Sequence, residues 1–391
     1  MRLSKRIQAV TPSATMALSS RAKELAMQGR DVINLSIGEP DFNTPDFIGQ
    51  AAVDAIKKSK TDSYTPAGGL LELKEKIVDK INSEHKTHFS NQNIAVTTGA
   101  KYALYVLAQV LLNPEDEVLI PLPYWVSYGE QVKLAEAKPI FVKPKKGLKV
   151  TPADLQKYTH HKTKMLIINS PNNPSGQVYS RSELEAIGKW AAERQITIIA
   201  DDIYGKLVYN QTKFTSLLDL DEAIRQNVIL VDGLSKTYAM TGWRVGYIAG
   251  SSEMIKAVNS LLSHSTSNLS AVSQYAALAA LTGDQACVEE MRSEYEQRLN
   301  ILVPLLDNVT GFKLSEKPQG AFYLFPDISE ALKLTGYKTA NEFALALLEQ
   351  EGVATVPGEA FGYPNHLRIS YAADVNRVKE AFERINNFIK Q

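Results

Sequence analysis

One lysine of this chain is well suited to covalent chemistry. Lys236 lies in a loop that begins where the β-branched run 227–232 ends. A tight turn after a buried strand is a poor place for a solvated charge, and it suits an amine that must lose its proton and attack an aldehyde. Arg244 follows eight residues later, and a guanidinium beside a reactive amine suggests a phosphorylated carbonyl cofactor. Because Ser-Lys pairs also occur in ordinary surface loops, the rest of the chain must decide.

Other polar residues follow predicted strands in the same way. Gly99-Ala100-Lys101 follows one strand and opens a helix, so its free N–H groups and the helix dipole are available for a phosphate. The loop 169–176 follows another strand, although an ordinary turn needs the same Asn, Pro and Gly residues. Asp201 follows a third, where a helix cap is the commoner explanation, and Tyr204 adds a phenol nearby. Since ligands gather outside the carboxyl ends of parallel strands, these residues are candidates for one site.

The elements that must position these residues alternate between strands and helices. Helix-length patterns such as 102–112 and 182–194 separate most of the apolar runs that predict strands. This alternation predicts a mostly parallel sheet that is covered on both faces. The predicted strands are 94–98, 117–120, 139–142, 165–168, 196–200, 228–231 and 245–249.

The pattern changes after about residue 285 and predicts a smaller α+β lobe. A long charged helix at 286–306 precedes a strand pair near 320–325, a helix around 342–350, a strand at 366–371 and a final helix. We expect three parts: an N-terminal arm that also joins the small domain (1–44), a large domain (45–285) and a small C-terminal domain (286–391).

Composition excludes several classes of protein. The 43 Lys and Arg residues equal the 43 Asp and Glu residues, so nothing in the charge favours nucleic acid or an anionic membrane as a partner. The single Cys287 excludes an internal disulfide and a cysteine-cage metal site, and we expect no metal. No apolar run follows the charges at the amino terminus and no stretch approaches the length of a membrane span, so we expect a cytoplasmic protein.

Taken together, the motifs resemble those of the class I, fold-type-I aminotransferases, which use pyridoxal 5′-phosphate. The resemblance covers nearly the whole chain, and the order and spacing of the motifs are specific although each alone is weak. Their wording is closest to the Iβ subgroup of aspartate and prephenate aminotransferases. The family implies a three-layer α/β fold with a seven-stranded, mostly parallel sheet and a smaller α+β domain. The matching segments are 37–42, 63–68, 123–128, 170–176, 202–204, 235–236, 240–244 and 367–371.

The resemblance assigns the cofactor to particular residues. Lys236 would carry the internal Schiff base and shuttle the proton between the substrate Cα and the cofactor C4′. Asp201 would pair with the pyridine nitrogen, and Asp202 stands where the family usually has Glu. Asn173 and Tyr204 would hydrogen-bond the ring O3′ and hold down the pKa of the imine. The ring would stack on Trp125, the phosphate would be held by Gly99, Ala100, Ser235 and Arg244, and Tyr64 would reach the phosphate from the neighbouring subunit of a homodimer.

Substrate recognition divides between two carboxylates. The family places its α-carboxylate arginine at Arg368, which shares one strand face with Ser370, and the backbone of Gly38, with Trp125 and Asn173, would assist. Lys101 lies at a helix amino terminus, where the dipole disfavours a cation, so a ligand is a better explanation for it than the helix. The resemblance pairs Lys101 with Thr15 for the distal carboxylate.

Three interpretations compete. The first is an aspartate aminotransferase, which converts L-aspartate and 2-oxoglutarate to oxaloacetate and L-glutamate by ping-pong exchange. The Thr15 and Lys101 pair also occurs in prephenate aminotransferases, so a prephenate or broad aromatic and dicarboxylate enzyme remains an alternative. The second is a C–S β-lyase, which Lys101 disfavours because such substrates usually lack a second carboxylate. The third is a cofactor-sensing regulator, for which we would expect an added DNA-binding domain.

Overall fold

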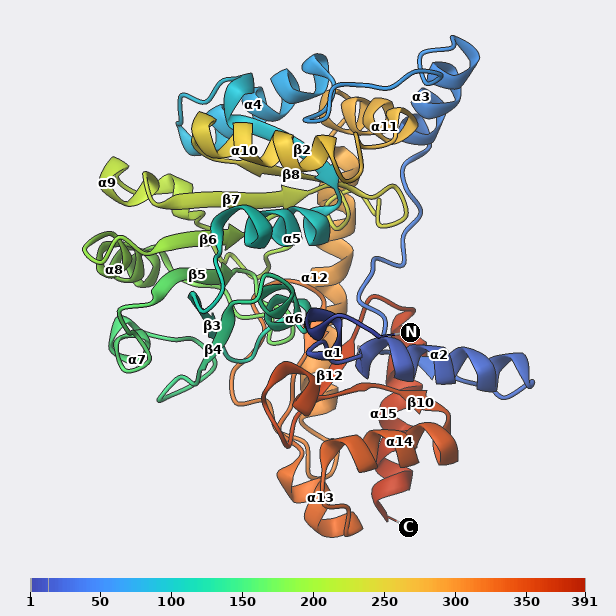
Figure 1. The fold of residues 1–391 in the computed structure, drawn as a ribbon. Coiled ribbons are helices and arrows are strands. Elements are labelled where there is room, and N and C mark those ends of the chain that lie inside the picture. The colour runs from blue at the N-terminus through green and yellow to red at the C-terminus, as the bar shows by residue number, and fades with distance from the viewer. Residues whose placement is uncertain (1, 13, 391) are drawn as a thin grey trace.

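A seven-stranded sheet forms the centre of the computed structural model, which describes residues 2–12 and 14–390 and leaves out the side chains of residues 14–16 (Figure 1). The strand order is β2-β8-β7-β6-β5-β3-β4. β8 runs antiparallel to β2 and β7, and all other pairs in this sheet are parallel, which confirms the predicted, mostly parallel sheet. The strands are β2 (Ile94–Thr98), β3 (Glu117–Pro121), β4 (Lys138–Val142), β5 (Thr163–Asn169), β6 (Thr197–Asp201), β7 (Val228–Gly233) and β8 (Val245–Ala249).

Helices cover both faces of this sheet because successive strand side chains point to opposite sides. In β5, Leu166 and Ile168 belong to one apolar cluster while Met165 and Ile167 belong to another. The first cluster includes residues of α3 (Asp46–Lys57), α4 (Leu71–His85), α7 (Pro152–Gln156), α8 (Arg181–Ala192) and α11 (Ala271–Thr282). The second includes residues of α5 (Ala100–Leu111), α6 (Ser127–Leu134) and α10 (Ser252–Ser263). The result is a three-layer α/β arrangement.

A smaller α+β part follows the sheet. It begins with α12 (Ala286–Leu306), at the predicted bounds, and contains a three-stranded sheet of order β11-β12-β9. Its further elements are β9 (Tyr323–Leu324), α13 (Ser329–Thr335), α14 (Ala340–Glu351), β10 (Val353–Ala354), β11 (Val356–Pro357), β12 (Leu367–Ser370) and α15 (Val375–Lys390).

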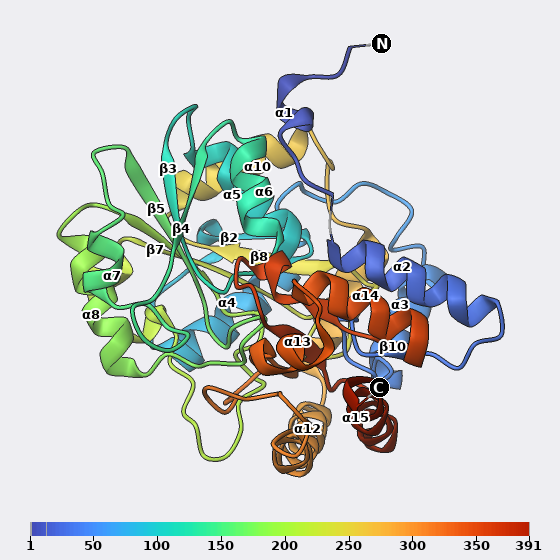
Figure 2. The same cartoon turned by 90° about the horizontal axis from the view of Figure 1, so that it is seen from below.

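The N-terminal segment packs on this smaller part. Its elements are α1 (Lys5–Gln8), α2 (Ala14–Met27) and β1 (Ile33–Asn34). β1 pairs in parallel with β10, and Leu18, Ala22 and Leu25 of α2 share a cluster with Leu348 and Ala354. Figure 2 shows α2 beside α14. The division of the chain at residues 44 and 285 stays a prediction.

The strand pair predicted near 320–325 is wrong, because β9 is the only named strand there. Ala321 has a φ of 57°, which interrupts the extended run, and Gly320 forms only an isolated bridge with Val208. Among the helices in the described ranges, none combines the length and apolar composition needed to cross a membrane.

The start of α5 presses on β8 at a glycine. A Cβ on Gly246 would lie 2.3 Å from the Ala100 nitrogen and 2.4 Å from the Gly99 carbonyl carbon. We therefore expect Gly246→Ala to lower the free energy of unfolding by about 1–3 kcal/mol, as overpacking does, measured by urea denaturation. Gly242→Ala is the matched control because a Cβ there meets no atom within 4 Å. Equal stability of the two variants would contradict the close packing.

Candidate active site

The carboxyl ends of β5 and β6 are joined by side-chain hydrogen bonds. Asn169 ends β5 and donates from Nδ2 to the backbone oxygen of Asp201, which ends β6, at 2.9 Å. The Asn169 Oδ1 accepts the backbone N–H of Asn173 at 2.9 Å. Both asparagines are buried. The loop 169–176 is therefore tied to the backbone of Asp201, the aspartate that the sequence singled out.

Lys236 lies beyond β7 and faces a segment from the other end of the chain. Its Nζ donates to the carbonyl of Gly38 at 2.5 Å. The same nitrogen lies 5.8 Å from the centre of the Tyr204 ring and 5.7 Å from that of Phe322. An ammonium in this position is held by aromatic faces and a neutral carbonyl.

The surroundings of Lys236 favour the neutral amine. The pKa of Lys236 is lowered from 10.5 to about 7, chiefly by burial; nearby cations also lower it, while Glu39 opposes them. These cations are Arg368, Arg244 and Lys101. A large fraction of the amine is therefore unprotonated, and nucleophilic, at neutral pH.

Asp201 is a buried carboxyl, 3% exposed. Burial raises its pKa to about 6. The Tyr128 hydroxyl donates to Oδ2 at 2.5 Å and the Ile203 N–H donates to Oδ1 at 3.4 Å, and both bonds favour the carboxylate. At pH 7 the group is mostly ionised, which suits a partner for a protonated ring nitrogen.

Tyr128 was missed by the sequence reasoning, which gave it no role although it quoted the motif that contains it. It lies in the first turn of α6, three residues after Trp125. The two rings meet edge to face, with centroids 5.4 Å apart and an interplanar angle of 80°. An aromatic residue three positions after the predicted stacking residue was the available signal, since a turn that leads into a helix brings such residues together; here the Tyr128 N–H bonds to the Trp125 carbonyl at 3.1 Å.

Arg368 is buried without an acidic partner among the described residues. One terminal nitrogen donates to Asn173 Oδ1 at 3.1 Å and the other to the Ser36 carbonyl at 2.6 Å. Its Nε finds no acceptor. The guanidinium carbon lies 4.6 Å from the Tyr323 ring centre and 5.1 Å from that of Phe361. A charged fork held by neutral groups, with one N–H unused, fits a carboxylate ligand.

Tyr204 is also buried, and its hydroxyl forms a hydrogen bond with that of Tyr323. Their hydroxyl oxygens are 2.8 Å apart, and burial raises the pKa of Tyr204 far above its usual value. Both phenols therefore remain protonated donors. Asp202, by contrast, accepts a hydrogen bond from Ser216 Oγ at 2.6 Å, and it is Asp201 that accepts from Tyr128.

The N-terminus of α5 lies next to the guanidinium of Arg244. Gly99 is the N-cap, has a φ of 80° and provides no side-chain cap. A Cβ at Gly99 would lie 2.6 Å from a terminal nitrogen of Arg244, whose other terminal nitrogen donates to the Thr241 carbonyl at 3.0 Å. Helix N–H groups beside an arginine fit a phosphate group. Ala100 opens this helix, and the buried Ser235 precedes Lys236.

Lys101 lies close to the indole that the sequence proposed as a stacking platform. Its Nζ is 5.1 Å from the centre of the Trp125 ring, and no acidic side chain within the described ranges pairs with it. Burial of the ammonium and the charge of Arg244 lower the pKa of Lys101. Tyr64 is 91% exposed in this single chain. The side chain of Thr15 lies outside the described residues.

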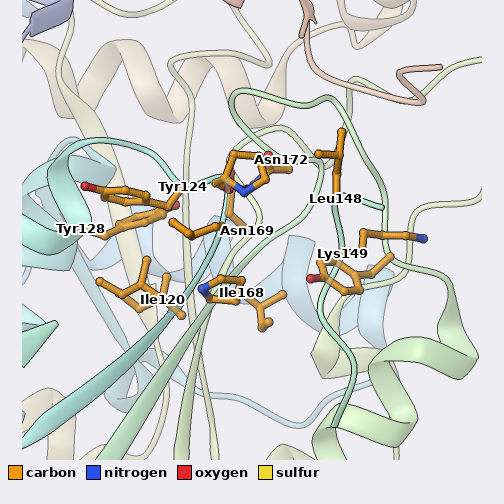
Figure 3. A pocket seen from close by; sticks show the side chains of 13 residues that line it. Ile120, Tyr124, Tyr128, Leu148, Lys149, Ile168, Asn169 and Asn172 are labelled. Carbon is orange, nitrogen blue, oxygen red and sulfur yellow. Dashed lines mark hydrogen bonds between the residues drawn. The ribbon is translucent and has the colours of Figure 1, made fainter. Parts of the chain in front are cut away.

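Tyr128 and Asn169 are among the residues that line a small cavity, which Figure 3 shows. Its volume of about 10 Å³ is close to the minimum for one water molecule. Neither Lys236, Arg244 nor Arg368 lines it. This cavity is therefore not the ligand site.

The pKa of Lys236 can be tested on the cofactor-free protein. Reductive methylation of Lys236 should rise with pH through a midpoint near 7, because only the neutral amine reacts. Peptide mass spectrometry measures the labelling, with the exposed Lys57 in the same digest as the reference. Labelling of Lys236 in parallel with Lys57 at every pH would contradict the depressed pKa.

Comparisons with known proteins agree with this geometry. The model of the family "Aminotransferase class I and II" matches residues 30–385. An aspartate aminotransferase of Bacillus sp. (strain YM-2) is 48% identical over 99% of each chain, and an asparagine–oxo-acid transaminase of Streptococcus mutans is 46% identical over the full length of both. The solved structure of Thermus thermophilus aspartate aminotransferase with maleate superposes with a TM-score of 0.93 at 38% identity, over 99% of this chain and 100% of that one. With its sheet and its polar residues at the strand ends, this chain belongs to the class I and II aminotransferases.

Proposed function

We propose that the protein is a pyridoxal 5′-phosphate-dependent aspartate aminotransferase that transfers the amino group of L-aspartate to 2-oxoglutarate in two half-reactions. The observation that carries the proposal is Lys236, an amine with a pKa near 7 among cations that suit anionic ligands. A relative 48% identical is named aspartate aminotransferase, which supports the choice of substrate.

The residues present fit the proposed cofactor. Helix N–H groups at Gly99 and the Arg244 guanidinium would hold the phosphate, with Ser235 and Ala100 at the same end. Asp201 would hold the ring nitrogen, Asn173 and Tyr204 the ring hydroxyl, and Trp125 the ring face. When bound, the cofactor supplies an electron sink that stabilises negative charge at the substrate Cα.

Lys236 would act twice. As a neutral amine it would be the group that holds the cofactor covalently, in exchange with the substrate amine. When it is free, the same amine would hold and move the proton of the substrate Cα. Its depressed pKa serves both steps because each requires an amine that loses and gains a proton near neutral pH.

Asp201 and Tyr128 would act as a pair. An ionised Asp201 would keep the ring nitrogen protonated, and the burial of Asp201 would strengthen this ion pair. The Tyr128 hydroxyl stabilises the carboxylate against the effect of burial. Tyr128 is therefore a positioning residue for Asp201.

Two cations would bind the two carboxylates of the substrate. Arg368, with its unused Nε–H, would bind the α-carboxylate that every amino acid carries. Lys101, which has no acidic partner among the described side chains, would bind the distal carboxylate of aspartate, with Thr15 as a second donor. The Streptococcus mutans relative is named for asparagine, whose neutral carboxamide gains less from the charge of Lys101. A prephenate aminotransferase would use the same pair and is the alternative.

A homodimer is part of the proposal. Tyr64 is 91% exposed, and α3 exposes the apolar side chains of Phe47, Val53 and Ile56. A second copy on this face would cover the apolar side chains and bring Tyr64 to the neighbour's phosphate. We also propose a cytoplasmic location, which suits the single Cys287.

Amino transfer by the purified protein tests the function directly. We expect aspartate and 2-oxoglutarate to give oxaloacetate and glutamate, with a higher kcat/KM for aspartate than for asparagine, tyrosine or phenylalanine. Prephenate with an amino donor tests the alternative. A preference for neutral amino acids would overturn the dicarboxylate assignment.

Lys101→Ser should separate acidic from neutral substrates. Loss of a charged hydrogen bond, worth about 1.5–3 kcal/mol, should lower kcat/KM for aspartate roughly 10- to 150-fold and leave phenylalanine little changed. Arg368→Ala is the reference and should impair every substrate. Single-turnover rates measure both. Equal losses for acidic and neutral substrates in Lys101→Ser would show that Lys101 supports the fold or the cofactor.

The shared site can be tested with hybrid dimers. Lys236→Ala and Tyr64→Ala subunits, inactive or weakened alone, should regain up to about a quarter of the wild-type activity when mixed at equal amounts, because half of the dimers are hybrids and each has one intact site. Native mass spectrometry confirms exchange of subunits. No recovery after confirmed exchange would indicate that Tyr64 acts within its own chain.

A further inference from the structure

One buried tyrosine contacts both the proposed cofactor side and the proposed substrate side of the site. Tyr323 of β9 is fully buried. Its hydroxyl lies 2.8 Å from that of Tyr204, and its ring centre lies 4.6 Å from the guanidinium carbon of Arg368. Neither the sequence nor the chemistry proposed above assigns it a role.

The backbone fixes the position of Tyr323. β9 and β12 are antiparallel, with Tyr323 opposite Ser370 and Leu324 opposite Ile369. Arg368 lies two residues before Ser370 on the same strand face, so it is the diagonal neighbour of Tyr323, within reach of a long or aromatic side chain. The ring is therefore placed against the guanidinium by strand register.

The hydroxyl end of Tyr323 is confined as well. A Cβ on Gly38 would lie 2.8 Å from the Tyr323 hydroxyl oxygen. The carbonyl of this glycine accepts the hydrogen bond from Lys236. The Tyr323 hydroxyl thus lies between Tyr204 and the residue that holds the catalytic amine.

We propose that Tyr323 is a positioning residue with two separable tasks, an inference that rests on the proposed function. Its ring holds the Arg368 guanidinium in the orientation that receives the α-carboxylate. Its hydroxyl donates to the Tyr204 oxygen and so turns the Tyr204 proton toward the cofactor's ring oxygen. This direction of the hydrogen bond follows because the Tyr204 hydroxyl has a single proton. If Tyr204 donates that proton to the ring oxygen, it can only accept from Tyr323.

Two substitutions separate the tasks. Tyr323→Phe keeps the ring and removes the hydroxyl, so Tyr204 becomes a weaker donor to the ring oxygen. In the enzyme loaded with the cofactor, the absorbance of the cofactor changes with pH. The midpoint of this change should rise by roughly 0.4 to 1 pH unit, which corresponds to the loss of an ordinary hydrogen bond. KM should change little. Tyr323→Leu also removes the aromatic face, so KM should rise roughly 10-fold for aspartate and for phenylalanine alike.

Tyr371→Phe is the matched control. Tyr371 is fully buried in the same apolar cluster and donates to the Ala321 carbonyl at 3.1 Å. Its substitution also removes a buried hydroxyl, yet it touches none of the proposed ligands. Neither the absorbance midpoint nor KM should move. A shift in Tyr371→Phe equal to that in Tyr323→Phe would reduce Tyr323 to a structural residue and overturn the proposal.

The remaining outcomes distinguish a failure of the role proposed for Tyr323 from a failure of the proposed function. An unchanged midpoint in Tyr323→Phe, with a borohydride-stable cofactor adduct on Lys236, overturns the hydroxyl task alone. A KM rise in Tyr323→Leu that affects aspartate and spares phenylalanine overturns the ring task. Absence of any adduct on Lys236 in the wild-type protein overturns the proposed function as well. Maleate binding measured by calorimetry gives a second readout, which Tyr323→Leu should weaken and Tyr323→Phe should preserve.

Discussion

The burial of the Lys236 amine is the constraint on which the site depends. Its direct partner is a neutral carbonyl, and the cations around it favour loss of its proton. The folded state binds this proton less tightly than the unfolded state, so the lysine lowers stability fully below pH 7, and the effect fades as pH rises toward 10.5. The rest of the fold must offset that cost. In return, the protein holds a nucleophilic amine at neutral pH.

The segment between β1 and α3 explains how the two parts of the molecule meet at this amine. Its carbonyl at Ser36 accepts from Arg368 and its carbonyl at Gly38 accepts from Lys236. Further along, Asp41 accepts two hydrogen bonds from one nitrogen of Arg298 in α12, at 2.9 and 2.8 Å. One non-helical segment therefore connects the amine of the large sheet, the arginine of β12 and the long helix.

Local patterns predicted the seven strands of the large sheet, the bounds of α12 and the glycine that precedes α5, because burial periodicity and helix-start residues are local signals. They did not predict the contacts of Tyr128 and Tyr323. The bond from Tyr128 to Asp201 joins residues 73 apart in the chain, and that between Tyr204 and Tyr323 joins residues 119 apart. Such contacts depend on sheet order and strand register. The prediction of a strand pair near 320–325 failed for a related reason, since the positive φ of Ala321 is imposed by its surroundings.

The central claim is that Lys236 forms the covalent link to pyridoxal 5′-phosphate. The most direct measurement is to load the purified protein with the cofactor, reduce it with borohydride, digest it and locate the added mass by tandem mass spectrometry. The account predicts one stoichiometric adduct on the peptide that contains Lys236. An adduct on another lysine, or spread over exposed lysines, with Lys236 unmodified would contradict it.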